Sequence, residues 1–269
     1  HVTLHPNDYV NWLEEQGYGG LYRGHGLGGN EVYPTVSAVP ERYTHTHWIV
    51  DESIEFLSQR DPDNPFFLWM VFEAPHSPFD PPEPFDRLYD DFDIPEARIG
   101  DWVNTDSEPA SLIEQRISNK ADRISPQILR KLRRHYYGQI THTDYQLGRF
   151  VGELKRLGLY DDTVIVITSD HGEHLGDHRL FAKYTFLESA AHIPLILRLP
   201  PRYPIAAHRE RQPVLTADIP MTLLELACVQ ANPNADGRSL LTLPDDRIVF
   251  GETKYAAFAT DERWKYVYY

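Results

Sequence analysis

The stretch TVIVITSDHG, residues 163–172, passes abruptly from β-branched residues to polar residues and glycine. Its first part, Thr163 to Thr168, is short, apolar and continuous, which is typical of a buried strand in a parallel sheet. Two similar runs are Phe66 to Phe72, followed by Glu-Ala-Pro-His, and Ile193 to Leu199, which ends at prolines. We expect these three runs to be parallel strands of one sheet.

Segments with helical spacing of apolar residues alternate with the strand-like runs. Ile128 to Leu157 is rich in helix-forming residues, and Gly158 stands where a helix C-cap is expected. Shorter helices fit Asp51 to Arg60 and Ala217 to Cys228. This alternation predicts an α/β fold with a mainly parallel sheet flanked by helices.

Two further segments have a different character. Pro78 to Ile94 is dense in proline, aspartate and aromatic residues, which favours a packed surface loop over a regular element or a free linker. Near the end of the chain, Arg247 to Gly251 and Arg263 to Tyr269 are strand-like and are separated by small and polar residues. These two runs predict a hairpin or a small added sheet.

The composition limits the classes of function. The 269 residues suit one large α/β domain, and 40 acidic against 26 basic residues give a formal charge of -14. That charge repels nucleic acids and anionic membrane surfaces, and an anionic substrate would need a local cation. The single cysteine, Cys228, excludes an internal disulfide and a cysteine zinc cluster.

The sequence leaves the compartment open. It has no apolar run of about eighteen residues, the length of a membrane-spanning helix. It begins at His1 without a signal-peptide pattern, so we expect a processed, truncated or partial chain. A periplasmic or secreted protein and a cytoplasmic one both fit, and no pattern indicates an oligomeric state.

Polar residues follow two of the predicted strands. His76 follows the first, and Asp170 and His171 follow the second. Because ligands of open α/β sheets bind at the carboxyl ends of the strands, we expect both groups at one edge. A carboxylate beside an imidazole can hold a divalent cation: a hard ion prefers Asp170, while His171 suits manganese, zinc or iron. The alternative is a capped turn with solvated side chains.

Other polar residues near this motif have less specific patterns. Lys183, flanked by aromatic residues, could pair with an anionic oxygen or protonate a leaving group, or be a surface charge. His174 and His178 are spaced like a metal-binding pair, but we favour a role in ordering the loop. His142 and Asp144, on the long predicted helix, are interpreted as structural or solvated.

Several long motifs resemble one known family. Residues 164–199, VIVITSDHGEHLGDHRLFAKYTFLESAAHIPLILRL, closely resemble the signature of the sulfatases, arylsulfatase-like members of the alkaline phosphatase superfamily. Residues 66–84, 214–226, 236–240 and 258–267 are similar to further segments of that family. The resemblance extends over most of the chain from about Thr44, and it implies an alkaline phosphatase-like sheet with a small C-terminal antiparallel sheet. We expect domains at 1–241 and, as the start of the smaller one, 242–269.

The resemblance also implies residue roles. Asp170 and His171 match the family's metal ligands, calcium being the expected ion, with manganese or magnesium as alternatives. Lys183 matches the lysine that contacts the sulfate, and His76 matches the histidine near the leaving oxygen. The implied reaction is attack on sulfur by a hydrated formylglycine, and the implied substrate is a small-molecule or carbohydrate sulfate ester, cleaved without any nucleic-acid partner.

One element of the family pattern is missing. Formylglycine arises from Cys or Ser in C-x-P-x-R, but Cys228 precedes Val-Gln-Ala-Asn and the proline after Ser37 is one place late. The resemblance therefore implies that the nucleophile and the family's paired aspartates lie in an N-terminal segment outside this sequence. A phosphonate monoester or phosphodiester hydrolase, transfer of a phosphoryl-linked headgroup, and a catalytically silent binding module are the alternatives.

Overall fold

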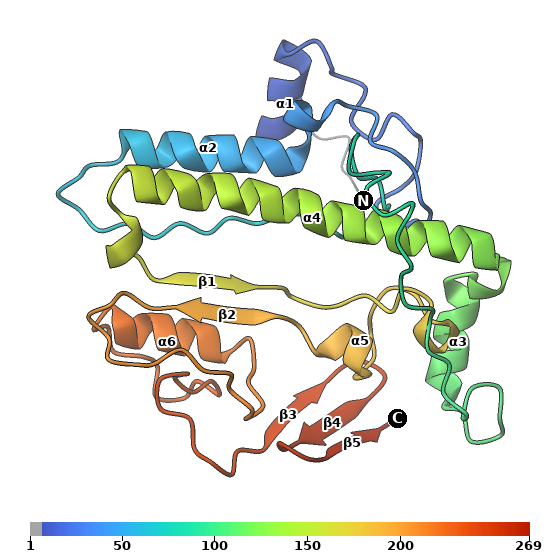
Figure 1. The fold of residues 1–269 in the computed structure, drawn as a ribbon. Helices are drawn as coiled ribbons and strands as arrows, with labels where there is room; N and C mark the ends of the chain where they lie inside the picture. Colours follow the sequence, from blue (N-terminus) through green and yellow to red (C-terminus); the bar gives the residue numbers. More distant parts are fainter. Residues whose placement is uncertain (1–6) are drawn as a thin grey trace. The chain divides into compact units, whose positions relative to one another are not determined.

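The computed structural model describes residues 7–269, and its chain forms two compact units that interleave in sequence (Figure 1). The sequence-based boundary at residue 241 stays a prediction. The first unit comprises the described residues up to Gly100, Arg116–Thr163 and Leu175–Phe181; the second comprises Asp101–Gln115, Val164–His174 and Ala182–Tyr269.

The first unit is built around a long helix. Helix α4, Pro126–Arg156, begins where the Ser125 hydroxyl accepts the N–H of Ile128, and it is followed by Gly158 with φ of 70°. The predicted helix is therefore confirmed. Proline at its first position and glycine after its end favour these boundaries. No described helix is both long and apolar enough to cross a membrane.

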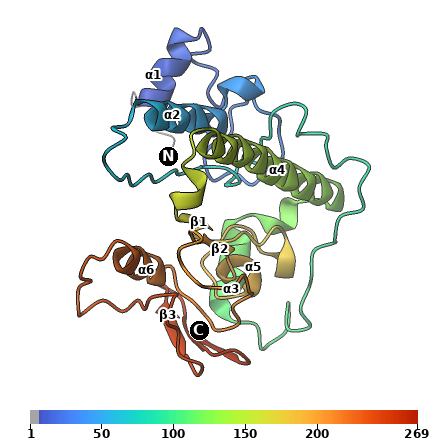
Figure 2. The ribbon, with the colours of Figure 1, turned by 60° about the vertical axis from the view of Figure 1, so that its left-hand side comes forward.

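Helix α2 lies along α4 in both views of the ribbon (Figures 1 and 2). It covers His45–Gln59, so it begins six residues before the predicted start at Asp51. The Thr44 hydroxyl caps this helix by accepting the N–H of His47 at 3.3 Å, a signal that apolar spacing alone does not contain. The remaining helices are α1, Asp8–Glu15; α3, Ala110–Ser118; α5, Glu188–Ala191; and α6, Asp218–Leu226.

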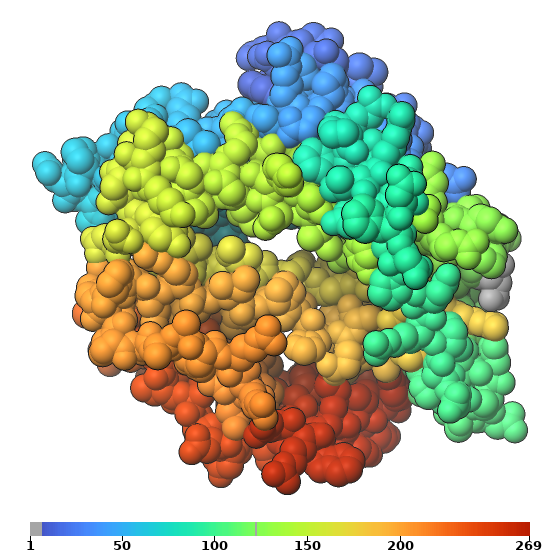
Figure 3. Space-filling view, viewed as in Figure 1, coloured from blue at the N-terminus to red at the C-terminus, as the bar shows by residue number. Residues whose placement is uncertain are grey.

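The predicted loop 78–94 packs against α4. Phe79 is completely buried and joins Leu132 of α4 in the core of the first unit. The Phe85 ring lies 4.9 Å from the His142 ring, and the Tyr89 hydroxyl is 2.7 Å from the Thr141 hydroxyl. In the space-filling view this turquoise part of the chain covers some of the green surface of α4 (Figure 3). The prediction of a packed loop is confirmed.

Two glycines of α4 should respond in opposite ways to alanine. A Cβ at Gly138 would lie 2.4 Å from the carbonyl oxygen of Phe85, whereas a Cβ at Gly148 would have no neighbour within 4 Å. We expect Gly148→Ala to raise the free energy of unfolding by roughly 0.5–1 kcal/mol through helix propensity. Gly138→Ala should lower it by roughly 1–3 kcal/mol through overpacking. Urea unfolding measures both, and a shift of the same sign in both variants would contradict this packing.

The second unit contains the strand that precedes the Asp-His motif. Strand β1, Ile165–Thr168, pairs with β2, Leu195–Arg198, so two of the predicted strands are confirmed. The pairing is antiparallel, with Ile165 opposite Arg198, so the expected parallel arrangement is wrong for this pair. A parallel connection needs a crossover element, but the intervening residues 169–194 contain only the 3-10 helix Asp177–Arg179 and the four-residue helix α5. Strand β2 therefore begins beside the C-terminal end of β1, with Leu195 opposite Thr168.

The predicted strand Phe66 to Phe72 is not present as a strand. Its side chains alternate in exposure as in an extended segment, with Phe67 74%, Trp69 79% and Val71 60% exposed and less exposed residues between them. However, it forms no ladder with another strand in residues 7–269. A short continuous run of apolar residues predicts the local extended conformation, but pairing requires a backbone partner elsewhere in the chain.

The C-terminal part of the second unit is a small antiparallel sheet, as predicted. Its strands are β3, Val249–Glu252; β4, Ala257–Thr260; and β5, Lys265–Tyr268, paired in that order. The central strand β4 lies in the small and polar residues between the two predicted runs, where no strand was predicted. Alanine is a weak strand former, and here its pairing on both sides stabilises the extended conformation.

A buried ion pair joins helix α6 to the chain that follows it. Asp218, at the start of α6, is completely buried and accepts two hydrogen bonds of 2.8 Å from the Arg247 guanidinium. Its carboxylate also accepts the N–H groups of Leu215 and Arg238. Burial raises the pKa of Asp218, but these hydrogen bonds outweigh burial and the net shift is downward.

Candidate functional site

Asp170 and His171 lie in the loop directly after β1. The Asp170 carboxylate is 85% exposed, and one of its oxygens accepts the N–H of His171 at 3.0 Å. The other oxygen lies 3.6 Å from Nε2 of His171, whose side chain is 28% exposed. The two side chains therefore present an oxygen and a nitrogen to the same space.

The tautomer of His171 follows from its neighbour. Its Nδ1 lies 2.8 Å from the carbonyl oxygen of Gly172. Because a carbonyl oxygen can only accept, Nδ1 carries the proton and the neutral ring has its lone pair on Nε2. Gly172 is required here, since a Cβ would lie 2.2 Å from the Ser189 carbonyl oxygen. The hydrogen bond from Nδ1 of His171 to the Gly172 carbonyl oxygen orients the ring, as such bonds do in metal-binding histidines.

The geometry of this pair fits two positions in the coordination shell of one cation. Ligand atoms about 2.0–2.6 Å from an ion lie roughly 3–4 Å from each other, which includes the 3.6 Å between Nε2 of His171 and the Asp170 oxygen. Within residues 7–269 no group of three or more potential ligands gathers to complete the shell. The pair does not by itself distinguish calcium from manganese or magnesium.

Hydrogen bonds hold the backbone of Ala182 and Lys183. The preceding Ala182 donates its N–H to the Glu173 carboxylate at 2.6 Å and accepts the N–H of His174 at 3.1 Å. The carbonyl oxygen of Lys183 accepts from the side-chain amide of Gln115. Ala182 has a φ of 63°, a left-handed conformation that non-glycine residues adopt only when their surroundings impose it. These contacts fix the backbone from which the ammonium projects.

His174 orders the same loop, as predicted. Its ring is 1% exposed, and its two nitrogens lie 2.7 Å from the Ser189 hydroxyl and 3.2 Å from the Thr185 hydroxyl. His178 belongs to the first unit, where its Nδ1 accepts the N–H of Gly100 at 3.0 Å. Both rings thus have partners that explain them without a metal.

Removal of the Glu173 carboxylate tests the hold on Lys183. We expect Glu173→Ala to speed hydrogen exchange of the Ala182 amide about tenfold, because one hydrogen bond of about 1–1.5 kcal/mol is lost. Glu173→Gln retains the accepting oxygen and is the matched control. Native-state hydrogen exchange measures both variants, and an unchanged Ala182 amide in Glu173→Ala would show that the carboxylate does not hold this turn.

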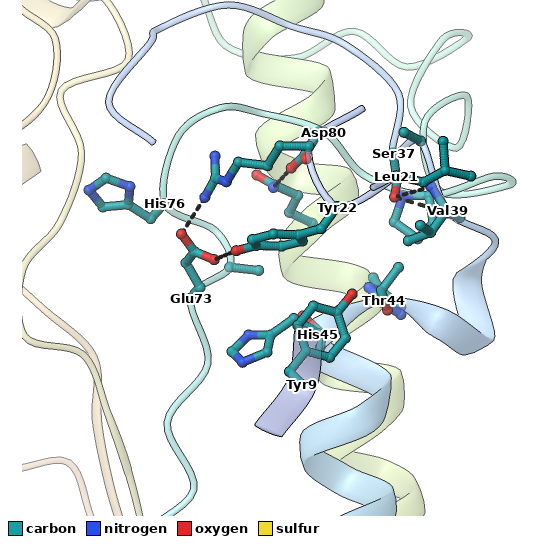
Figure 4. A pocket seen from close by; sticks show the side chains of 17 residues that line it. Tyr9, Leu21, Tyr22, Ser37, Val39, Thr44, His45, Glu73, His76 and Asp80 are labelled. Carbon is teal, nitrogen blue, oxygen red and sulfur yellow. Dashed lines mark hydrogen bonds and ion pairs between the residues drawn. The ribbon is translucent and has the colours of Figure 1, made fainter. Parts of the chain in front are cut away.

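His76 lies in the first unit, at a tight turn. Its N–H donates to the carbonyl oxygen of Glu73 at 2.9 Å, and its ring Nδ1 is 2.9 Å from the carbonyl oxygen of Ser77. Nδ1 therefore carries a proton, and Nε2 is the nitrogen that can exchange one. His76 lines a hollow together with Tyr22 and Arg23, both of which contact the Glu73 carboxylate. Figure 4 shows His76 with Tyr22 and Glu73 at this hollow.

The polar residues around His76 were not predicted from the sequence. The Tyr22 hydroxyl donates to Glu73 at 2.9 Å, and burial together with that carboxylate raises the pKa of Tyr22 to about 12. His25 lies 3.0 Å from Asp80 on the other side of the turn. The available signal was the glycine-rich segment 17–29, GYGGLYRGHGLGG, whose Tyr, Arg and His supply these contacts.

The structure thus brings Asp170 and His171 together, with Lys183 in the same unit, and places His76 in the first unit. The expectation that His76 meets Asp170 and His171 at one edge of a sheet stays a prediction.

Comparisons with known proteins agree on one family. The family model described as Sulfatase matches residues 3–229. An arylsulfatase of Clostridium perfringens is 35% identical over 90% of this chain and 50% of its own length. A multifunctional alkaline phosphatase superfamily protein, PehA, of Trinickia caryophylli is 30% identical over 76% of the chain and 42% of its length. The chain thus spans about half the length of the curated relatives it matches.

A solved structure shows the same fold. The phosphonate monoester hydrolase of Agrobacterium radiobacter superposes with a TM-score of 0.77 and 24% identity, and the match covers 99% of this chain and 61% of that chain. At this level of identity the similarity establishes the fold, which confirms the predicted α/β class.

Proposed function

Because the chain belongs to the sulfatase family of the alkaline phosphatase superfamily, we propose that the protein hydrolyses sulfate esters of small molecules or carbohydrates. The proposal includes a divalent metal, with calcium as the first candidate, and a formylglycine nucleophile contributed by residues outside these 269. The observation that supports it most directly is the Asp170 and His171 pair, which offers an oxygen and a nitrogen 3.6 Å apart.

Each proposed residue has a separate task. Asp170 and His171 would hold the metal, which when bound supplies positive charge to the oxygens of the ester. The Lys183 ammonium, on its restrained backbone, would attract the charge that develops on those oxygens in the transition state. His76, once protonated at Nε2, would donate that proton to the leaving oxygen. Its Nδ1–H would meanwhile stay hydrogen-bonded to the carbonyl oxygen of Ser77. These cationic groups would offset the repulsion of an anion by a chain of charge -14.

Hydrolysis of phosphonate monoesters is the second candidate. The similarity to the Agrobacterium radiobacter enzyme favours it, since tetrahedral sulfur and phosphorus centres would use the same metal ligands and lysine. The substituent on the central atom distinguishes the two substrates, because a sulfate monoester and a phosphonate monoester both carry one negative charge but only the phosphonate has a carbon on that atom.

The test compares both substrates in the intact protein. We expect a higher kcat/KM on 4-nitrophenyl sulfate than on 4-nitrophenyl phenylphosphonate, loss of turnover in EDTA, and recovery with calcium. Peptide mapping should find a formylglycine residue outside residues 1–269. A preference for the phosphonate would support the second candidate, while no turnover of either ester by a protein that carries formylglycine would refute both.

A further inference from the structure

A hollow in the first unit has polar walls whose hydrogen bonding is incomplete (Figure 4). The cavity measures about 80 Å³, several times the roughly 10–15 Å³ that one enclosed water needs. Its walls come from α1, α4, the start of α2, the glycine-rich segment 17–29, residues 37–39 and the turn that contains His76. Apart from His76, no wall residue has a role in the proposed function.

The walls have hydrogen-bond donors without acceptors. The Arg23 guanidinium donates through Nη2 to Glu73, but its Nε and Nη1 are buried and have no acceptor in residues 7–269. Nδ1 of His45 is also buried and lacks a partner in that part of the chain. A buried donor left unpaired is unfavourable, and such groups call for a specific explanation. The two arginine nitrogens indicate an acceptor inside the hollow, while Nδ1 of a neutral His45 ring can pair with a hydroxyl group as donor or as acceptor.

The walls also have an acceptor without a donor. Gln139 of α4 is 4% exposed, and its amide nitrogen donates to Asp80 at 3.0 Å and to the carbonyl oxygen of Pro78 at 3.3 Å. Since those two contacts fix the amide nitrogen, Oε1 is the accepting end, and it is buried without a donor in the described residues. The occupant of the hollow must therefore donate as well as accept.

The carboxylates around the hollow already have partners. Arg23 is paired with Glu73, and His25 lies 3.0 Å from Asp80. Burial lowers the pKa of His45, which Glu73 opposes and Arg23 reinforces, so this ring is neutral near pH 7. An additional anion would face the carboxylates of Glu73 and Asp80, and an additional cation would face Arg23. An uncharged hydroxyl, which both donates and accepts, meets these demands without new charge.

We propose that this hollow binds neighbouring hydroxyl groups of an uncharged polyol, with Arg23 and His45 pairing with hydroxyl oxygens and Gln139 accepting a hydroxyl proton. A ring bearing adjacent hydroxyls presents such donors and acceptors side by side, so one ligand can satisfy both walls of the hollow.

The aromatic part of the wall fits the same ligand. The rings of Tyr9 and Tyr22 pack edge to face, with centroids 5.4 Å apart, and both line the hollow. Such rings offer an apolar surface to the C–H groups of a polyol. His76 lines the hollow too. On this point the inference rests on the proposed function: the bound polyol would be the leaving alcohol, and a second anionic group on that alcohol would be disfavoured.

A binding experiment tests the site without turnover. The intact protein is titrated with methyl glucopyranoside and with methyl glucuronopyranoside, in which a carboxylate replaces the hydroxymethyl group, and saturation-transfer NMR reports binding. We expect saturable binding of the uncharged glycoside and weaker binding of the uronide. Arg23→Met should weaken glycoside binding about tenfold through lost hydrogen bonds. Arg87→Met, at an arginine whose side chain is 74% exposed, should leave it unchanged.

A second variant separates binding from folding. His45→Phe retains an aromatic ring beside Tyr9, whose centroid is 4.9 Å away, and removes the unpaired nitrogen. It should also weaken glycoside binding, with an unfolding temperature close to that of the wild type. Absence of saturable glycoside binding, tighter binding of the uronide, or wild-type affinity in both variants would overturn the inference. Glycoside binding by a protein that cleaves no sulfate ester would instead refute the proposed function and leave this site in place.

Discussion

Asp170→Ala in the intact protein is expected to abolish metal binding and to lower kcat/KM for a sulfate ester by at least about a thousandfold. The carboxylate is 85% exposed and accepts only local hydrogen bonds, so the variant and the metal-free wild type should unfold at nearly the same temperature. Metal content after gel filtration and turnover of 4-nitrophenyl sulfate measure the two effects. Full turnover in this variant would remove Asp170 from the proposed site.

Two further variants make the comparison specific. Asp106→Ala removes an exposed carboxylate elsewhere in the second unit and should change neither metal content nor rate. Lys183→Ala should reduce the rate and leave the metal bound, because the ammonium acts on substrate oxygens and not on coordination. Loss of metal from Lys183→Ala would mean that the lysine variant disturbs the loop, and the two roles would have to be reassigned.

Asp218→Asn is expected to lower the free energy of unfolding by about 3–5 kcal/mol. The substitution leaves the Arg247 guanidinium, 7% exposed, without its buried counter-charge. Urea unfolding followed by circular dichroism measures the change. The double variant Asp218→Leu with Arg247→Leu removes both charges and should be more stable than Asp218→Asn. Equal or lower stability of the double variant would show that packing, and not the unpaired charge, dominates this cluster.

The same carboxylate gives the stability a pH dependence of known sign. The pKa of Asp218 is lowered in the folded protein, so the folded state releases this proton more readily than the unfolded state. Its contribution is therefore complete above the unfolded pKa of about 3.9 and is lost as the pH falls through the folded value. In Asp218→Asn that contribution is absent, and unfolding should depend less on pH below about 4.

Local patterns predicted the local structure well. Helix α4 follows from its apolar spacing, the proline at its start and Gly158 after its end. Strand β1 and the loop with Asp170 and His171 follow from the change from β-branched to polar residues. The resemblance to the sulfatases predicted the family, which the matching model and relatives confirm.

Properties that depend on distant residues were not predictable in the same way. The antiparallel pairing of β1 with β2 depends on the path of residues 169–194, and Phe66 to Phe72 stays unpaired although its apolar run is typical of a strand. The hydrogen bonds of Tyr22 and Arg23 to Glu73 join residues about fifty positions apart in sequence. Neither periodicity nor residue type specifies which distant partner a polar side chain meets.

The interleaving of the two units limits how this chain can be divided by evolution or by protein engineering. The polypeptide passes from one unit to the other after Gly100, Gln115, Thr163, His174 and Phe181. A recombination crossover between residues 101 and 181 would therefore combine parental sequences within both units at once. Exchange of a whole unit between homologues therefore needs several coordinated junctions, whereas a single contiguous exchange would replace parts of both units.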